Sequence, residues 1–200
     1  MEYIVPILPL KYDLETKEVL KQLGRTNRKL AELKGVAHTI PNENILISTL
    51  TLQEAKDSSE VENIVTTQDD IYKADLDLKH SIINVSAKEV VNYREALQRG
   101  FALVRQNKLL TSNIIKEVQA CLESNKAGFR SLPGTSLKRN DGVVVYTPPQ
   151  TLDEITRLMT NLESFINDDS LSDLDPLIKM AIIHHQFESI HPFYDGNGRT

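Results

Sequence analysis

The chain ends with HPFYDGNGRT (residues 191–200), which gathers several chemically active groups. His191 titrates near neutral pH and can accept a proton from a reacting hydroxyl group. Asp195 supplies a hard oxygen ligand of the kind that holds Mg²⁺ beside phosphates. Gly196 and Gly198 allow backbone N–H groups to approach an anion closely. This combination predicts transfer of part of a nucleotide.

Asn197 and Arg199 add hydrogen-bond donors that suit phosphate oxygens. Taken singly, each of these residues is more often structural, as in a glycine-rich turn with a solvated Asp195 and a helix-capping histidine. The whole string within nine residues, 191–199, favours the catalytic interpretation.

The residues before this string predict the element that positions it. Asp175 is a helix N-cap and Pro176 suits the first helical position. The following LIKMAIIHHQF is apolar on nearly every side, which predicts a central buried helix. This helix ends at His191, because a residue before proline is pushed out of the helical region.

The rest of the chain is predicted to be mostly α-helical, with helices over 14–33, limited by Asp13 and Gly35, and over 41–57. Further helices begin at capping signals: the box Ser86–Glu89, then Thr111 or Ser112, then the box Thr151–Glu154. Behind the last box an apolar stripe is formed by Ile155, Leu158, Met159, Leu162 and Phe165. Two short extended runs around Asn140-Asp141-Gly142 predict a hairpin.

Composition narrows the function classes. The 23 Lys and Arg against 28 Asp and Glu give a net charge of −5, which argues against broad nucleic-acid binding. Cys121 is the only cysteine, so no intrachain disulfide forms. No apolar run approaches the ~20 residues that span a bilayer, and the start lacks a basic signal-peptide region. We therefore expect a cytoplasmic protein that binds neither membrane nor nucleic acid.

The string HPFYDGNGR resembles the signature of the Fic family, H-P-F-x-D/E-G-N-G-R-x-x-R. The resemblance extends back through PLIKMAIIHHQFESI and the hairpin to about Pro41. It implies a mostly α-helical core with a small β-hairpin, called the flap. We assign residues 86–200 to this core and residues 1–85 to an N-terminal helical extension that carries an inhibitory motif.

Most Fic enzymes transfer AMP from ATP, with Mg²⁺, to a hydroxyl group of a target protein. The resemblance implies that His191 is the general base and that Asp195 holds the metal. It also implies that Phe193 anchors the loop, while the nucleotide phosphates are bound by Gly196, Asn197, Gly198 and Arg199. Such transfer depends on positioning and charge stabilisation more than on covalent chemistry.

The flap, residues 131–147, aligns the target segment by adding a strand to it in this family. Its target-docking residues are expected to be Thr135, Ser136 and Leu137. The implied partner is a protein with a Ser, Thr or Tyr hydroxyl, and self-modification and homo-oligomers also occur in the family.

An inhibitory motif of the family, S/T-x-x-x-E-G/N, is matched by Ser58, Glu62 and Asn63. Alone, such a string in a polar helix carries little weight. Beside the signature, it implies that Glu62 points into the nucleotide site and pairs with the second arginine of the signature. There the Glu62 carboxylate would pair with the guanidinium of that arginine and repel phosphate, while Ser58 and Asn63 would stabilise the helix.

The sequence departs from the family at one point, because the second arginine would fall three residues after Arg199 and the chain ends at Thr200. We therefore expect these 200 residues to be a fragment with impaired transfer, or a degenerate member, and Arg199 to be the substitute partner of Glu62. Two alternatives to AMP transfer stay open: removal of AMP from a modified protein, and a catalytically silent nucleotide- or protein-binding module. Family variants that transfer phosphate or phosphocholine are disfavoured by the DGNGR form.

Overall fold

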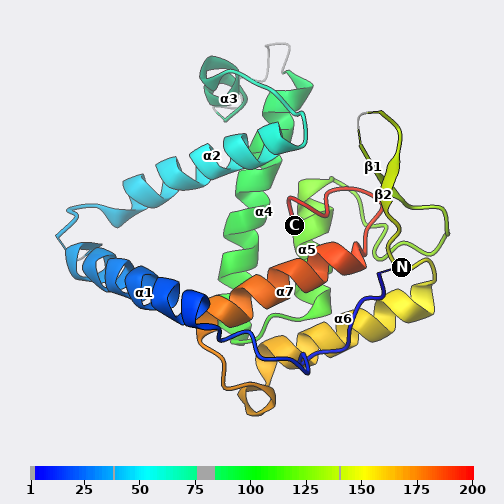
Figure 1. The fold of residues 1–200 in the computed structure, drawn as a ribbon. Coiled ribbons are helices and arrows are strands. Elements are labelled where there is room, and N and C mark those ends of the chain that lie inside the picture. The colour runs from blue at the N-terminus through cyan, green and yellow to red at the C-terminus, as the bar shows by residue number, and fades with distance from the viewer. Residues whose placement is uncertain (1–2, 38, 76–83, 140) are drawn as a thin grey trace.

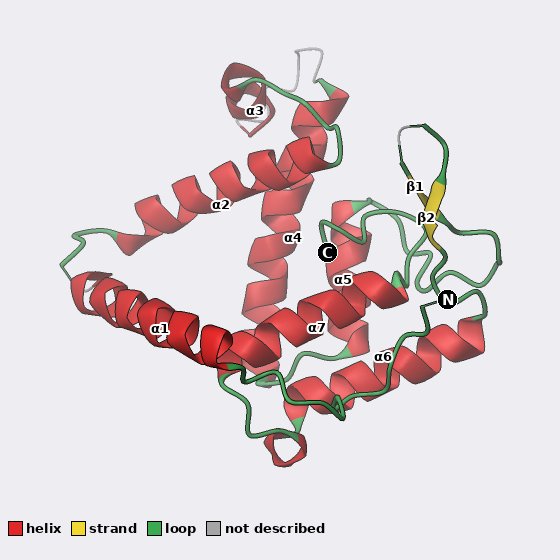
Figure 2. Ribbon diagram, in the orientation of Figure 1, coloured by secondary structure: helices red, strands yellow, loops and turns green. Residues whose placement is uncertain are grey.

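A computed structural model describes residues 3–37, 39–75, 84–139 and 141–200. The fold is mostly α-helical with a small antiparallel sheet, which confirms the predicted fold class (Figures 1 and 2). The helices are α1 (Lys17–Ala37), α2 (Glu43–Val61), α3 (Gln68–Asp75), α4 (Val85–Asn107), α5 (Ser112–Leu122), α6 (Leu152–Asn167), the 3₁₀ helix η1 (Asp169–Leu171) and α7 (Pro176–Ile190). The strands are β1 (Leu137–Lys138) and β2 (Val144–Tyr146).

The main core is formed around α6 and α7, beneath the C-terminal loop (Figure 1). The predicted α6 stripe is confirmed, since all five of its apolar residues are buried. They pack with residues of α5, α7 and the loop, including Ile115, Ile178, Ile182, Ile190 and Phe193. Burying these side chains stabilises the helices on which the loop rests.

Most of the predicted helix starts are confirmed. Thr111, Thr151 and Asp175 are N-caps whose side chains accept hydrogen bonds from backbone N–H groups of the first turn. The box at Ser86 was the wrong start for α4, because Asn84 is the N-cap and accepts from the Ser86 N–H at 3.1 Å. Asn and Ser cap helices about equally well, so two candidates this close compete.

The N-terminal helices differ from the prediction at their ends. The expected limits of α1 were wrong, because the helix begins after Thr16, whose hydroxyl accepts from the Val19 N–H, and it continues past Gly35. Helix α2 runs on to Val61 and so includes Ser58. Helices α2 and α3 pack on α4, where Ala55, Ile71 and Val90 form a second small core (Figure 1).

The predicted hairpin is present, with Leu137 opposite Tyr146 and Lys138 opposite Val144, and a bulge between the pairs. Of the predicted turn, Asn140 lies outside the described residues, while Gly142 has a φ of 82°. This left-handed value favours glycine at that place.

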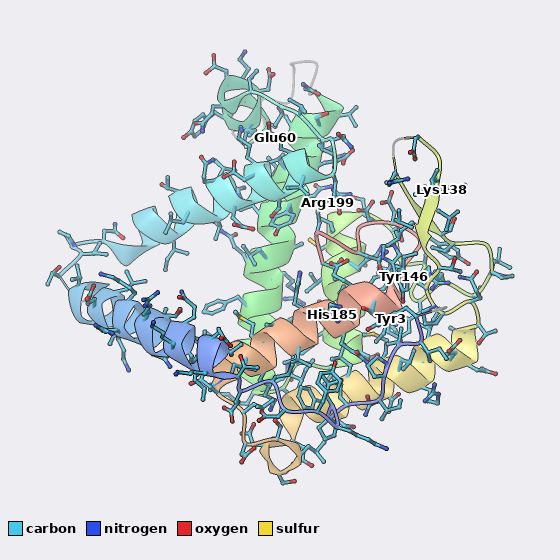
Figure 3. All side chains as sticks on the ribbon, viewed as in Figure 1. Tyr3, Glu60, Lys138, Tyr146, His185 and Arg199 are labelled. Carbon is cyan, nitrogen blue, oxygen red and sulfur yellow. The ribbon has the colours of Figure 1, made fainter. Side chains whose placement is uncertain are left out.

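The N-terminal segment, residues 3–16, crosses the main core in an extended conformation (Figure 1). We call it the strap, and its start lies beside the flap. The Asn161 side chain accepts from the Leu8 N–H at 2.8 Å and donates to its carbonyl at 2.9 Å. Tyr3 packs edge-to-face on Tyr146, with 5.9 Å between ring centroids, and lies near His185 (Figure 3). Among the described residues, no helix has both the length and the apolar content needed to cross a membrane.

Candidate active site

His191 lies at the C-terminal end of α7, where it caps the helix in the left-handed conformation with φ 49° and ψ 60°. Its backbone N–H donates to the Phe187 carbonyl at 2.9 Å. Its Nδ1 is buried and has no hydrogen-bond partner among the described residues. Burial lowers the pKa of His191, and the positive charge of Arg130 lowers it further. The lowered pKa favours the neutral imidazole, which is the form that can accept a proton.

Arg130, which precedes the flap, is the fully buried cation beside His191. Its Nε donates to the His191 carbonyl at 2.8 Å, and its Nη2 donates to the carbonyls of Pro149 and Ile190. Its backbone N–H donates to the Pro192 carbonyl at 2.9 Å. One side chain thus joins the end of α7 to both sides of the flap.

The loop after His191 is held in shape by Asn197. The Asn197 side chain accepts from the Phe193 N–H at 2.8 Å and donates to the Phe193 carbonyl at 2.9 Å. Phe193 is fully buried between Phe129 and Phe187, with ring centroids 5.4 and 6.3 Å away. The Asn197 amide therefore stabilises the loop from inside, rather than offering its side-chain donors outward to an anion.

Both glycines of the turn lie against carboxylates. An added Cβ would lie 2.5 Å from the Glu123 carboxylate at Gly196, and 2.5 Å from the Glu62 carboxylate at Gly198. Gly196 also has a φ of 74°, which side chains rarely adopt. Glycine is therefore favoured at position 196 by its backbone conformation, whereas at position 198 a side chain would displace the Glu62 carboxylate.

Arg199 is surrounded by three carboxylates that come from separate parts of the chain. Its Nε contacts Glu62, its Nη2 lies 2.9 Å from Glu123, and its Nη1 lies 3.4 Å from Glu89. The contact expected between Glu62 and Arg199 is therefore present. The Arg199 side chain is only 4% exposed, so a phosphate would have to displace these groups to reach it.

Glu62 reaches Arg199 because of the way α2 ends. Asn63 has a φ of 65°, its N–H donates to the Glu60 carbonyl, and the Ile64 N–H donates to the Ser59 carbonyl. This is the Schellman arrangement, in which the left-handed position accepts glycine or asparagine. Ser58 donates to Glu54 at 2.7 Å, within the same helix.

The carboxylates around Arg199 outnumber its single positive charge. The pKa of Glu123 is raised by burial, and Asp195, Glu89 and Glu62 add to the effect against the opposing charge of Arg199. Burial also raises the pKa of Glu188 on α7, with Glu62 adding to it. Three carboxylates around one guanidinium leave a local negative charge that repels a polyphosphate.

Asp195 could serve as the single protein ligand of a magnesium ion. Its side chain accepts from the Gly196 N–H at 2.8 Å and is exposed. The described residues contain no group of three or more His, Cys, Asp or Glu side chains that could hold a metal. Mg²⁺ often takes one or two protein carboxylates and completes its octahedron with phosphates and water, so one exposed Asp is compatible with that mode.

The flap is tied to the loop at its base. The Tyr194 hydroxyl accepts from the backbone N–H groups of Ser131 and Leu132, both at 2.9 Å. Leu137 begins β1, whereas Thr135 and Ser136 precede the strand. The Thr135 carbonyl accepts from the Gln150 side chain at 3.0 Å, so this part of the flap edge is already paired within the chain.

Sequence reasoning missed Arg130, Glu89 and Glu123, which the structure brings to the site. Arg130 and Glu123 lie outside any recognisable motif, and Glu89 was assigned only to a capping box.

Comparisons with known proteins show the family of the chain. Two sequence profiles match the chain: the Fic/DOC family N-terminal region over residues 20–102, and the Fic/DOC family itself over residues 109–200. A helical core that holds this histidine and glycine turn beside a small hairpin defines a Fic-type domain. The chain belongs to the Fic/DOC family.

The relatives are long proteins of low sequence identity. The chain is 29% identical over 119 residues to proteins named protein adenylyltransferase Fic from Drosophila erecta and Drosophila melanogaster. That match covers 58% of this chain and 24% of each relative, so the chain spans about a quarter of their length.

Solved structures share the fold. A Fic family protein from Desulfovibrio desulfuricans superposes with a TM-score of 0.73 at 19% identity, covering 94% of this chain and 55% of the other. A Fic domain-containing signalling protein from Bacteroides thetaiotaomicron gives a TM-score of 0.69 at 21% identity, covering 86% and 67%.

Proposed function

We propose that the chain carries the catalytic site of a protein adenylyltransferase and that Glu62 holds this site in an inhibited state. The contact of Glu62 with Arg199 at the glycine turn is the observation that carries the proposal. The names of the curated relatives support nucleotidyl transfer as the reaction type.

In the proposed reaction, His191 accepts the proton of a Ser, Thr or Tyr hydroxyl on the target. The hydroxyl oxygen attacks the α-phosphorus of ATP, and pyrophosphate leaves. The backbone N–H groups at Gly196 and Gly198, with Arg199, would bind the phosphates, and Asp195 would hold Mg²⁺. When bound, the metal would neutralise charge that develops on the phosphates. The flap would align the target segment by strand addition.

Inhibition follows from the competition for Arg199. ATP must replace Glu62 and its neighbours as the partner of the guanidinium and must approach several carboxylates. A charge-assisted hydrogen bond of this kind contributes about 1.5–3 kcal/mol, which corresponds to roughly 10- to 100-fold in an equilibrium constant.

The test incubates the protein with Mg²⁺ and ATP and measures AMP addition by intact mass. Glu62→Gly should raise self-modification by about 10- to 100-fold over wild type. Glu60→Gly is the matched control, because Glu60 lies in the last turn of α2, two residues before Glu62, but pairs with Lys56 instead of Arg199 (Figure 3). The assay is run on residues 1–200 and on the longest product of the gene.

Two results would count against the proposal. If Glu60→Gly activates as strongly as Glu62→Gly, weakening of α2 and not loss of the arginine contact explains the gain. If no variant in either length adds AMP, the transferase function is wrong and a binding role is favoured.

The position of Glu62 also supports a second candidate, hydrolytic removal of AMP from a modified protein. Its carboxylate lies against Gly198, where it could orient a water molecule beside the bound phosphate. The two reactions are separated by one variant: Glu62→Gly should raise AMP addition but abolish AMP removal from a pre-modified target.

A further inference from the structure

Among the described residues, the hydrogen-bond acceptors of the buried Arg130 guanidinium are all neutral. Arg130 is fully buried, and its guanidinium donates to backbone carbonyls of Pro149, Ile190 and His191. Burial of a cation that donates to no carboxylate is costly, and it lowers the pKa of Arg130, against a smaller opposing effect of Glu154. A protein retains such a group where the bonds it makes are needed.

Two of those carbonyls belong to the C-terminal end of α7. The last carbonyls of a helix lack intrahelical partners and carry the negative end of the helix dipole. A guanidinium at this place satisfies the carbonyls of Ile190 and His191 and is itself stabilised by the dipole. Arg130 is therefore a cap for the helix that presents the proton acceptor.

His191 requires such support because its backbone is strained. A left-handed conformation costs a non-glycine residue roughly 1–2 kcal/mol, and it persists where surrounding bonds determine it. The His191 N–H is held by Phe187 and its carbonyl is held by Arg130. With both flanking peptide groups fixed, the direction in which the imidazole leaves the helix is fixed as well.

We infer that Arg130 is a positioning residue for His191, which holds the backbone of the proton acceptor through its carbonyl and locks it to both sides of the flap. The role in catalysis rests on the proposed transferase function. Misplacing a catalytic group by about 1 Å can cost on the order of 100-fold in rate, which sets the scale of the expected effect.

The charge of Arg130 adds a second consequence. The groups that act on the His191 ring are Arg130, which lowers its pKa, and the Glu188 backbone and Asp195, which raise it. Loss of the cation should therefore raise the pKa of His191. Because the general base must be neutral, the rising limb of kcat/KM against pH should move to higher pH.

The experiment compares Arg130→Gln with Arg130→Lys and with Arg157→Gln, an exposed arginine on α6, as the control. The pKa of His191 is measured by NMR on histidine-labelled protein without nucleotide, with the resonance assigned from His191→Asn. Arg130→Gln should raise this pKa, while Arg130→Lys and Arg157→Gln should leave it near wild type.

Activity is measured in parallel on the Glu62→Gly background. Arg130→Gln should lower kcat by about 10- to 100-fold with little change in KM, and Arg130→Lys should lower it less, because an ammonium cannot reach all three carbonyls. A folded Arg130→Gln with the His191 pKa and kcat of wild type would overturn the inference.

If Arg130→Gln does not fold, Arg130→Lys tests whether Arg130 positions His191, because the lysine keeps a cation at the end of the helix. A Lys variant with wild-type kcat then counts against positioning. If the Glu62→Gly background transfers no AMP, the proposed function fails, and the NMR comparison still decides whether Arg130 acts on His191.

Discussion

The signature loop has a buried arginine at each end, and the two are held in opposite ways. Near His191, Arg130 donates to the backbone carbonyls of Ile190 and His191. At the far end, Arg199 binds the side chains of Glu62, Glu89 and Glu123. Backbone carbonyls in a packed core cannot leave without local unfolding, whereas carboxylate side chains can rotate away.

This difference separates a preorganised part of the site from an exchangeable part. The end at His191, the base end, is held in place without a ligand, as expected where the proposed catalysis depends on fixed geometry. The arginine end is occupied by carboxylates, which carry the same sign of charge as a phosphate, so the proposed binding of nucleotide there is an exchange of partners. Variants at the base end should cause large losses, and variants at the arginine end should cause smaller changes, some of them gains.

The largest effect is expected at His191. His191→Asn keeps a residue that tolerates the left-handed conformation, but it removes the proposed general base. On the Glu62→Gly background, AMP transfer should fall by about 10²- to 10⁴-fold with little change in melting temperature. Retention of more than a tenth of the transfer rate would mean that another group accepts the proton.

The next effect concerns the anchor of the loop. Phe193→Ala should lower the free energy of unfolding by about 3–5 kcal/mol, because Phe193 is fully buried between two aromatic rings. Urea unfolding measures this loss. Phe101→Ala, at a position 63% exposed, is the matched control and should change stability by about 0.5 kcal/mol or less. Equal losses would show that Phe193 is not a special anchor.

A smaller effect is expected where α2 ends. Asn63→Ala should cost about 1 kcal/mol at the left-handed position and so weaken the hold of Glu62 on Arg199. AMP addition should rise by about 5-fold. Asn63→Gly fits the same conformation and should stay near wild type. Similar activation by both variants would indicate that the backbone at this position does not control Glu62.

The smallest effect is a pH dependence at Glu123. Since its pKa is raised in the folded protein, its contribution to stability is full at low pH and is lost as pH rises from the usual glutamate range through the raised pKa. Glu123→Gln removes this loss, so its melting temperature relative to wild type should rise over that window, by about 2 °C or less. A constant difference across pH would contradict the raised pKa.

Local signals in the sequence predicted much of the fold. Thr151 and Asp175 cap their helices because the hydrogen bonds involved span two or three residues. The α6 stripe follows from helical periodicity alone. The error at Ser86 arose between two capping residues of similar strength, of which Asn84 is the one that caps α4.

The candidate site was predictable only where it is contiguous in the chain. The signature string and the Glu62 motif carry recognisable patterns, but Glu123 and Glu89 meet Arg199 from 76 and 110 residues away. Nothing in their neighbours marks them, because their position depends on how α4 and α5 pack together. The same holds for Arg130, whose partners are backbone carbonyls and so leave no side-chain signature.

The strap at the start of the chain has a practical consequence. Because Tyr3 rests on Tyr146 at the root of the flap, a purification tag fused ahead of it would emerge beside the surface where a target segment is proposed to dock (Figures 1 and 3). Such a tag could itself occupy the flap or obstruct other substrates. Tag-free protein is therefore the appropriate material for any search for the natural target.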